Sequence, residues 1–311
     1  MNYIVFDLEW NQPNDGKDSS ERELLFEIIE IGAVKLDKNR NIISKFNELV
    51  RPKVYKQLNW RTQKMMNMKM KDLIRYGSPF PDVFRRFMEW CGEDVMFCTW
   101  GTQDLTELQR NIHYYDMEPL SNGPIGFYDV QRMFSQHMNE ENVTRNLEAA
   151  VDMIEIDKDI PFHRAYSDAY YTAKIFAEFD KKLLGMGLSY DLYHLPASKK
   201  DEVHILQGKN YYSVSEGYKE RTDITENRRI LGMTCAKCGG RNVRPKIRWF
   251  SSGTKVYYGA AICSIHGPMS CKLRIKKHEC GLYYIEKFIK YSSMEAIEQI
   301  RKKKVDLKGK E

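Results

Sequence analysis

The stretch YIVFDLE, residues 3–9, decides which fold the sequence favours. Its apolar, β-branched and aromatic start is typical of a buried strand, and it contains two carboxylates, Asp7 and Glu9. Residues two apart in a strand share a face, so both carboxylates point the same way. Two carboxylates held side by side repel each other unless a cation neutralises them. The strand end is therefore a candidate platform for a divalent metal, the alternative being a solvated strand end.

Two later segments bring further acidic residues to the ends of predicted elements. Asp104 follows an apolar strand predicted over residues 95–100 and opens a helix predicted over 104–114. His163 precedes a helix predicted over 167–184, and Asp168 lies in the first turns of that helix. Taken singly, Asp104 is explained as a helix cap and His163 as a surface residue. It is the ordered conjunction with Asp7 and Glu9 that points to a catalytic site.

The remaining pattern predicts a mixed sheet flanked by helices, hence an α/β fold. Strands are predicted over residues 28–36 and 42–50, helices over 65–73, 81–90 and 147–154, and a strand or helix start over 127–134. The composition changes near residue 190. We expect a catalytic domain over 1–189, a polar linker over 190–232 with weak strand signals at 203–206 and 211–214, and a small module over 233–311 that ends in a helix over 294–304.

As a set, these acidic motifs resemble the DEDDh branch of the DnaQ-like (RNase T-like) 3′→5′ exonuclease superfamily. The residues that carry the resemblance are Phe6-Asp7-Leu8-Glu9, Asp104, His163-Arg164-Ala165 and Asp168-Ala169, over roughly residues 1–184. The opening DLEWNQ, residues 7–12, looks most like bacterial relatives of the exonucleases that trim histone mRNA and small RNAs. Trp10 after Glu9 and Ser167 before Asp168 depart from the usual pattern, which leaves substrate preference open.

The resemblance implies a ribonuclease H-like fold and a reaction with two Mg²⁺ or Mn²⁺ ions. Asp7 would bridge both ions, Glu9 and Asp168 would hold the ion that binds water, Asp104 would act at the second site, and His163 would be the general base. The implied product is a nucleoside monophosphate released from a single-stranded 3′ end, with RNA favoured over DNA. Trp10 is a candidate for stacking on the terminal base, with core packing as the alternative.

The C-terminal module contains two matching segments, CAKCG at residues 235–239 and CSIHG at 263–267. Each has two ligand residues separated by two positions, followed by a glycine that permits a tight turn around a metal. Cys235, Cys238, Cys263 and His266 therefore predict one structural zinc ion, and the segment resembles a zinc ribbon. Cys271, Cys280 or His278 are alternatives to His266 as the fourth ligand.

Charge is divided unequally along the chain. The net charge of +6 combines −6 over residues 1–189 with +12 over residues 190–311. A basic segment favours a polyanionic partner, and we take Lys246, Arg248, Lys272 and Arg274 as candidate nucleic-acid contacts. The alternatives are a stabilising appendage with solvated charges, or a module that binds a protein partner.

Composition narrows the remaining classes. A hydrophobic fraction of 42% with 30% charged residues is typical of a globular protein, and the absence of a long apolar run predicts no membrane span. The N-terminus lacks the pattern of a secretory signal, so we expect a cytoplasmic protein whose seven cysteines are metal ligands and core thiols. Two further readings stay open: a DNA proofreading or repair exonuclease, and a non-catalytic nucleic-acid-binding protein on a nuclease fold.

Overall fold

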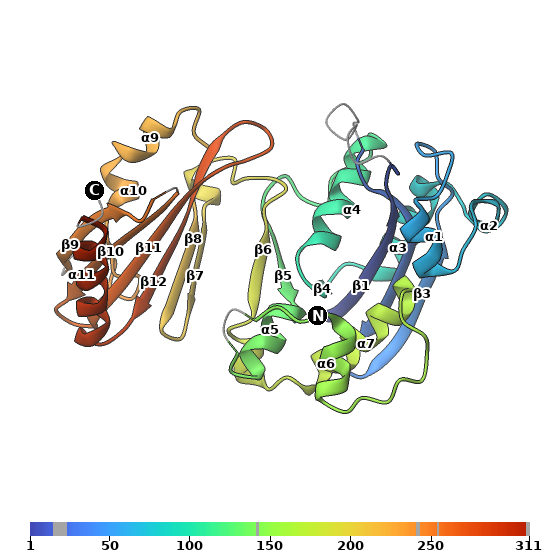
Figure 1. The fold of residues 1–311 in the computed structure, drawn as a ribbon, viewed down its shortest axis with the longest axis horizontal. Helices are drawn as coiled ribbons and strands as arrows, with labels where there is room; N and C mark the ends of the chain where they lie inside the picture. The colour runs from blue at the N-terminus through green and yellow to red at the C-terminus, as the bar shows by residue number, and fades with distance from the viewer. Residues whose placement is uncertain (15–23, 141–142, 241–242, 254, 309–311) are drawn as a thin grey trace. The chain divides into compact units, whose positions relative to one another are not determined.

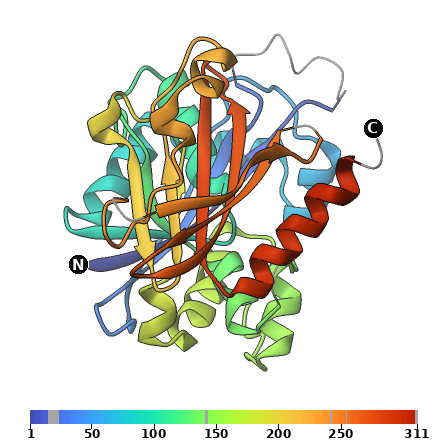
Figure 2. The same ribbon diagram turned by 90° about the vertical axis from the view of Figure 1, so that its left-hand side faces the viewer.

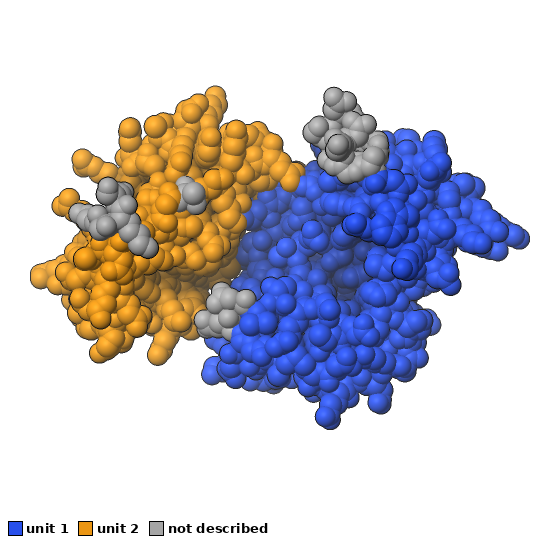
Figure 3. All heavy atoms as spheres, viewed as in Figure 1, with its two compact units in different colours: residues 1–193 blue, residues 194–311 orange. Residues whose placement is uncertain are grey.

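The protein was studied as a computed structural model, which describes residues 1–311 except 15–23, 141–142, 241–242, 254 and 309–311 (Figure 1). It forms two compact units, residues 1–193 and residues 194–311 (Figure 3). Each unit is built on a six-stranded sheet of its own. Among the described residues, no helix has both the length and the apolar character that crossing a membrane requires.

The first unit contains a mixed sheet in the order β3-β2-β1-β4-β5-β6. Antiparallel pairing joins β1 to β2, β2 to β3 and β5 to β6, whereas β1, β4 and β5 run parallel. This mixed sheet confirms the predicted α/β class. The strands are β1 (Asn2–Asn11), β2 (Glu27–Leu36), β3 (Ile42–Leu49), β4 (Val95–Thr99), β5 (Ile125–Asp129) and β6 (Leu188–Asp191).

Helices cover both faces of this sheet, as predicted (Figure 1). Ile4, Phe6 and Leu8 of β1 lie in one core with α3 (Phe80–Cys91) and α4 (Gln103–Tyr114). Val5 lies in the other core, with α5 (Val130–His137), α6 (Leu147–Met153) and α7 (Ala165–Glu178). Because strand side chains alternate, Asp7 and Glu9 follow Val5 onto the α7 face.

Two helices predicted as continuous are each divided in the structure. The helix expected over 167–184 ends at Glu178, and α8 (Lys181–Leu184) begins after Asp180, whose side chain accepts a hydrogen bond from Leu183 N at 2.6 Å. The helix expected over 65–73 is α1 (Trp60–Met66) and α2 (Met70–Tyr76), separated by Asn67 in the left-handed conformation. In both cases an Asp or Asn side chain favours a helix end over continuation.

The second unit is a fully antiparallel sheet in the order β7-β8-β12-β11-β10-β9. Its first two strands lie in the segment predicted as a linker, which also contains the short helices α9 (Arg221–Thr225) and α10 (Arg228–Leu231). The sequence pattern does not predict that these strands belong to the second unit, because β8 pairs with a strand about seventy residues later in the chain. The strands are β7 (Val203–Gln207), β8 (Asn210–Val214), β9 (Val243–Ser251), β10 (Val256–Cys263), β11 (Gly267–Lys277) and β12 (Tyr283–Tyr291).

The second sheet has one buried face and one half-exposed face. Along β11 the odd-numbered residues from Met269 to Ile275 are buried, whereas the even-numbered ones are half-buried. On the buried face, Leu273 and Ile275 pack against residues from α9 and α10. The C-terminal helix α11 (Met294–Lys308) crosses the other face, where Ile297 packs on β9 and β10 (Figure 2).

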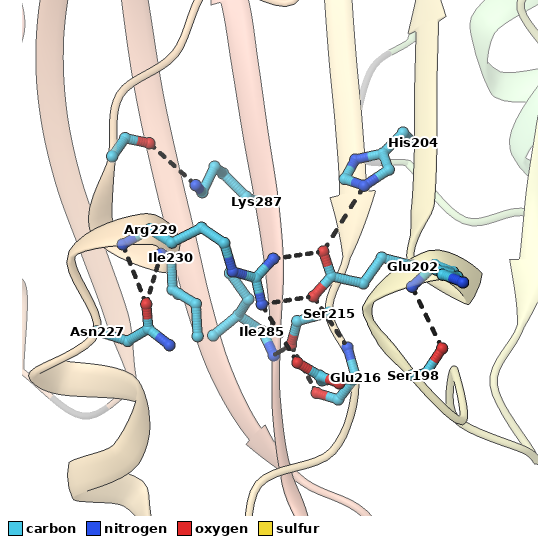
Figure 4. Close-up of polar contacts among 12 residues, drawn as sticks. Ser198, Glu202, His204, Ser215, Glu216, Asn227, Arg229, Ile230, Ile285 and Lys287 are labelled. Carbon is cyan, nitrogen blue, oxygen red and sulfur yellow. Dashed lines mark hydrogen bonds and ion pairs between the residues drawn. The ribbon is translucent and has the colours of Figure 1, made fainter.

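Polar contacts fix the segment before β9 to the second sheet (Figure 4). Arg229 of α10 donates two hydrogen bonds to the Glu202 carboxylate, at 2.8 and 3.2 Å, and lies 3.3 Å from a carboxylate oxygen of Glu216. Lys287 of β12 is buried, and its Nζ donates to the Gly232 carbonyl at 3.0 Å. Bidentate arginine–carboxylate pairs hold geometry tightly, so residues 215–232 are packed against the sheet and the predicted linker is part of the second unit.

Candidate active site and metal centres

Three of the predicted acidic residues converge in the first unit. Asp7 and Glu9 of β1 and Asp168 in the first turn of α7 have carboxylate oxygens that all lie within 4.8 Å of one another. Asp104, at the start of α4, accepts a hydrogen bond from Leu8 N at 3.1 Å. All four line one open pocket of about 560 Å³, together with His163.

A glycine in β2 allows α7 to approach the carboxylate strand. Gly32 pairs directly with Asp7 in the β1–β2 register. A Cβ atom at Gly32 would overlap the backbone of Ala165 and Tyr166, the first two residues of α7. Because glycine has no side chain there, the start of α7 rests on the sheet backbone and carries Asp168 to the carboxylates of β1.

The pKa values of the four carboxyl groups are all raised. Burial, followed by the neighbouring Asp104 and Asp168, raises the pKa of Asp7 well above its ordinary value. Burial is also the main cause for the other three: it raises the pKa of Glu9 to about 8, of Asp104 to about 7 and of Asp168 to about 6. Buried carboxylates that repel each other are stabilised by a cation, and an all-oxygen donor set suits Mg²⁺ or Mn²⁺.

His163 stands at the edge of this pocket. Its side chain is exposed, its backbone is left-handed with φ of 66°, and its N–H donates to Asp168 Oδ1 at 3.3 Å. A left-handed conformation is uncommon for a residue other than glycine and is found preferentially at functional sites. The predicted base and the acidic residue five positions later are therefore joined through the backbone.

A buried ion pair beside the carboxylates was missed by the sequence analysis. Glu30 of β2 is fully buried and pairs with Glu9 across the sheet. Arg164 donates to it twice, from Nε to Oε2 at 3.0 Å and from Nη2 to Oε1 at 2.7 Å. The signal was present as a glutamate within the otherwise apolar strand EIIEIGAV, residues 27–34, and an arginine directly after His163.

The structure places the predicted nucleic-acid contacts in different surroundings. Trp10 lines the carboxylate pocket, and its ring also packs against Phe26 with a centroid distance of 5.6 Å. Lys246 and Arg248 are exposed on β9, whereas Lys272 and Arg274 are half-buried on β11. Of these, Arg274 faces a carboxylate, with its Nη1 3.9 Å from Oε2 of Glu286.

The second unit gathers the four predicted zinc ligands. Cys235, Cys238, Cys263 and His266 each offer one ligand atom, and these atoms all lie within 4.8 Å of one another. Cys235 Sγ and Cys263 Sγ lie 3.4 and 3.7 Å from His266 Nδ1, and the sulfurs of Cys238 and Cys263 are 3.6 Å apart. A tetrahedral zinc site with ordinary bond lengths has ligand–ligand separations of about 3.6–3.8 Å, so the donor set fits zinc.

The backbone conformation and the hydrogen bonds around these four residues also favour metal binding. Gly239 and Gly267, the glycines after the two ligand pairs, have φ of 69° and 82°. Burial acts to raise the pKa of Cys235, but hydrogen bonds from Tyr291 and from the backbone of Lys237 outweigh it and lower that pKa to about 6. A thiolate is the form that binds zinc.

The alternative fourth ligands lie outside the cluster. Cys271 is in the core of the second unit, where burial raises its pKa to about 12. Cys280 instead contacts His278, with Sγ 3.0 Å from Nδ1. Of the alternatives, only His266 joins the three cysteines in the described residues.

Comparison with known proteins shows which protein family the chain resembles. The exonuclease family model RNase_T matches residues 4–176. A DNA polymerase III PolC-type of Caldanaerobacter subterraneus subsp. tengcongensis is 24% identical over 186 residues, which are 60% of this chain and 12% of that protein, so the chain spans only a small part of this relative.

The solved structures that resemble this chain include those of two nucleases. The nuclease domain of 3′hExo, a DEDDh family member, bound to rAMP, is 18% identical over 61% of this chain and 96% of its own, with a TM-score of 0.49. E. coli exonuclease I in complex with a dA16 oligonucleotide is 13% identical over 78% of this chain and 61% of its own, with a TM-score of 0.46. The family model covers more than half of the chain and includes all five predicted catalytic positions, and the chain therefore belongs to the RNase_T exonuclease family of the DEDDh, DnaQ-like superfamily.

Proposed function

We propose that this protein is a metal-dependent 3′→5′ exonuclease that releases nucleoside monophosphates from single-stranded 3′ ends, with RNA favoured over DNA. One observation carries the proposal: the carboxylates of Asp7, Glu9 and Asp168 meet within 4.8 Å in an open pocket that Asp104 and His163 also line. Membership of an exonuclease family supports the same chemistry. The pocket volume of about 560 Å³ lies in the range of sites that bind nucleotide-sized ligands.

The four carboxylates would hold two Mg²⁺ or Mn²⁺ ions. Such ions, when bound, stabilise the attacking and leaving oxygens of a phosphoryl displacement. The residues of the chain supply position and proton transfer. His163 at the pocket edge takes the proton of the attacking water, and its N–H bond to Asp168 keeps base and carboxylate in register.

The ion pair of Arg164 with Glu30 helps to hold the pocket carboxylates in position. It joins the start of α7 to β2 next to Glu9, and the guanidinium lowers the pKa of Glu9 against the larger effect of burial. Trp10 in the pocket wall offers a ring for the terminal base; replacing it with alanine should then raise KM for oligonucleotides with little change in kcat.

We further propose that Cys235, Cys238, Cys263 and His266 bind one structural zinc ion. The distances between their ligand atoms and the lowered pKa of Cys235 support this proposal. The net charge of +12 over residues 190–311 supports a role for the second unit in holding nucleic acid, with Lys246, Arg248, Lys272 and Arg274 as candidate contacts. Binding of a protein partner is the alternative use of this unit.

A second candidate is a DNA exonuclease of the proofreading or repair type. The observation that favours it is the 24% identity to a segment of a DNA polymerase. The catalytic residues are the same in both cases, so the two candidates differ in the polymer that is degraded faster.

The experiment uses single strands of RNA and DNA labelled at the 3′ or the 5′ end, with Mg²⁺ or Mn²⁺. We expect immediate loss of a 3′ label, stepwise shortening of a 5′-labelled strand, and faster decay of RNA. His163→Ala should slow the reaction by about 100- to 10,000-fold, the usual contribution of a general base. Shortening from the 5′ end, or no metal-dependent shortening of either polymer, would refute the proposal; faster decay of DNA would favour the second candidate.

A further inference from the structure

The half-exposed face of the second sheet carries a row of directly paired residues across five strands. Tyr212 of β8 pairs with Phe288 of β12, Phe288 with Lys272 of β11, Lys272 with Tyr258 of β10, and Tyr258 with Phe250 of β9. Directly paired residues share a face of a sheet, so four rings and one lysine lie in line. We call these five residues the aromatic row; each of their side chains is half-buried.

Packing of the core does not account for most of the aromatic row. Cys271 and Leu273, on either side of Lys272 in the chain, are buried in cores on the opposite face. Tyr212, Tyr258 and Phe288 belong to none of the hydrophobic cores of the described residues, and only Phe250 packs against the core under α11. The rings contact one another instead, with centroids 4.9 Å apart for Tyr212 and Phe288 and 6.2 Å apart for Phe250 and Tyr258.

A pocket opens where lysine interrupts the rings. Between the two ring pairs, residues of the sheet and of α11 line an open pocket of about 430 Å³. This volume lies in the range of pockets that bind small organic ligands, and it admits a nucleotide. Its lining includes Tyr258, Lys272, Phe288, Lys290, Ile300 and Lys303.

The charge of this pocket is uncompensated. No ion pair of the described residues involves Lys272, Lys290 or Lys303, although Lys303 Nζ lies 3.7 Å from the centroid of the Tyr258 ring. Two residues along β12 from Phe288, the basic side chains are paired with a carboxylate: Glu286 lies 3.9 Å from Arg274 and 2.9 Å from Lys276. An anion is therefore drawn to the pocket in preference to the neighbouring part of the face.

We propose that the aromatic row and its pocket bind single-stranded nucleic acid, with one base between Phe288 and Tyr258 and the adjacent phosphates on Lys272, Lys290 and Lys303. Rings stack on bases with little regard to sequence, and lysines contact phosphates. An acidic polypeptide would pair with the lysines but has no flat bases to stack on the rings of Phe288 and Tyr258. The inference rests on the proposed exonuclease function only for its purpose, which is to hold a strand while its end is degraded; binding itself needs no hydrolysis.

This surface differs from the contacts predicted by charge alone. Of the four predicted basic residues, Lys272 belongs to it, and Arg274 is paired with a carboxylate beside it. Lys246 and Arg248 of β9 are exposed and do not line the pocket.

The test is binding of a fluorescent circular oligothymidylate to the full chain, followed by anisotropy in zinc-containing buffer without Mg²⁺. A circle of about 30 nucleotides exceeds the site size of a single sheet surface and has no 3′ end to enter the active site. We expect Phe288→Ala to weaken binding about fivefold or more and Phe288→Trp to retain it. Lys272→Ala and Lys290→Ala should each lower the slope of log Kd against log salt by about 0.7.

Matched controls separate this surface from general charge and from fold. Lys199→Ala and Lys200→Ala remove exposed lysines of the same unit, and Tyr76→Ala removes an exposed ring of the first unit. All three should bind the circle as the wild type does. Lys290→Glu, at an exposed position, keeps the test decisive if Phe288→Ala lowers the melting temperature, because it should abolish binding without removing a packed ring.

Three results would overturn the inference. They are absence of binding at low salt, equal weakening by the Lys199 and Lys200 controls, and tight binding of poly-glutamate that Phe288→Ala leaves unchanged, which would indicate an acidic protein partner. Hydrolysis of thymidine 5′-monophosphate p-nitrophenyl ester reports the active site alone and should be unaffected by Phe288→Ala. A wild type that binds the circle but never hydrolyses this ester or a linear strand would refute the proposed function and leave this inference standing.

Discussion

At the scale of single residues, the four carboxyl groups of the pocket are difficult to ionise without a cation. A carboxyl group whose pKa is raised by folding binds its proton more tightly in the folded than in the unfolded chain. The metal-free protein should therefore lose stability as the pH rises through the values of about 6 for Asp168 and about 8 for Glu9. A bound cation should reverse this loss of stability at high pH, because the cation binds the ionised carboxylates.

Metal binding should accordingly release protons. At pH 6.5 Glu9 and Asp104, with pKa values of about 8 and about 7, are still largely protonated in the metal-free protein. Calorimetric titration with Mn²⁺ in two buffers of different ionisation enthalpy should show proton release at pH 6.5, less release at pH 9, and tighter binding at pH 9. Glu9→Gln should reduce the release by up to about one proton, whereas the exposed-surface control Asp82→Asn should not. Equal affinity and no release at both pH values would contradict the assignment of these residues as ligands.

The buried pair of Glu30 and Arg164 should be essential to stability as well as to activity. Arg164→Gln leaves a fully buried carboxylate without its partner and should destabilise the first unit by about 3 kcal/mol or more. Urea unfolding followed by tryptophan fluorescence reports mainly on this unit, which contains four of the five tryptophans. The double variant Glu30→Gln with Arg164→Gln should recover part of the loss.

The comparison for this pair is Arg86→Gln, which breaks an exposed pair with Glu48. Its cost should stay below about 1 kcal/mol. If Arg164→Gln is no more destabilising than Arg86→Gln, the buried pair does not hold α7 to the sheet.

At the scale of elements, the contact of α7 with β2 brings Asp168 to the carboxylates of β1. Gly32→Ala should push the start of α7 away from the sheet, because the new methyl group would overlap the backbone of Ala165 and Tyr166. We expect a loss of about 1–3 kcal/mol in stability and a marked fall in kcat on any substrate. In Gly126→Ala the new Cβ atom meets nothing closer than a Leu188 side-chain carbon at 3.5 Å, so that variant should be active and stable. A fully active Gly32→Ala would show that the position of Asp168 does not depend on this contact.

The two cysteine segments should act as one element through a shared zinc ion. We expect one zinc per chain by metal analysis, and Cys238→Ser should lose the metal and lower the melting temperature of the second unit. Cys280→Ser removes an exposed thiol outside the cluster and should retain both. Stoichiometric zinc in Cys238→Ser would exclude the proposed ligand set.

Most elements of the first unit could be predicted from the sequence because their signals are local. The strand of Asp7, the helix of Asp104 and the start of the helix of Asp168 each follow from a short periodic segment with a recognisable end. The division of the helix at Phe179 was missed because an apolar pattern continues across it, whereas the cap at Asp180 depends on a hydrogen bond to Leu183.

At the scale of the whole molecule, the features that the sequence did not predict depend on pairing between segments distant in the chain. The sequence of segment 190–232 predicts a linker, because its polar, tyrosine-rich strands resemble a loop until β8 is placed beside β12. Glu30 was missed for a related reason, because its partner Arg164 lies 134 residues away. The aromatic row is likewise visible only once β8 to β12 are in register.

The proposed function depends on a single carboxylate pocket in the first unit, in which Asp7 lies close to Glu9, Asp104 and Asp168. The most direct measurement is release of nucleoside 5′-monophosphate from a 3′-labelled strand with Mn²⁺, comparing wild type, Asp7→Asn and the control Asp82→Asn. We predict that Asp7→Asn is slower by about a thousandfold, which corresponds to roughly 4 kcal/mol of lost charge stabilisation, and that Asp82→Asn equals the wild type. Release by Asp7→Asn at the wild-type rate would contradict the assignment of the carboxylate pocket as the active site.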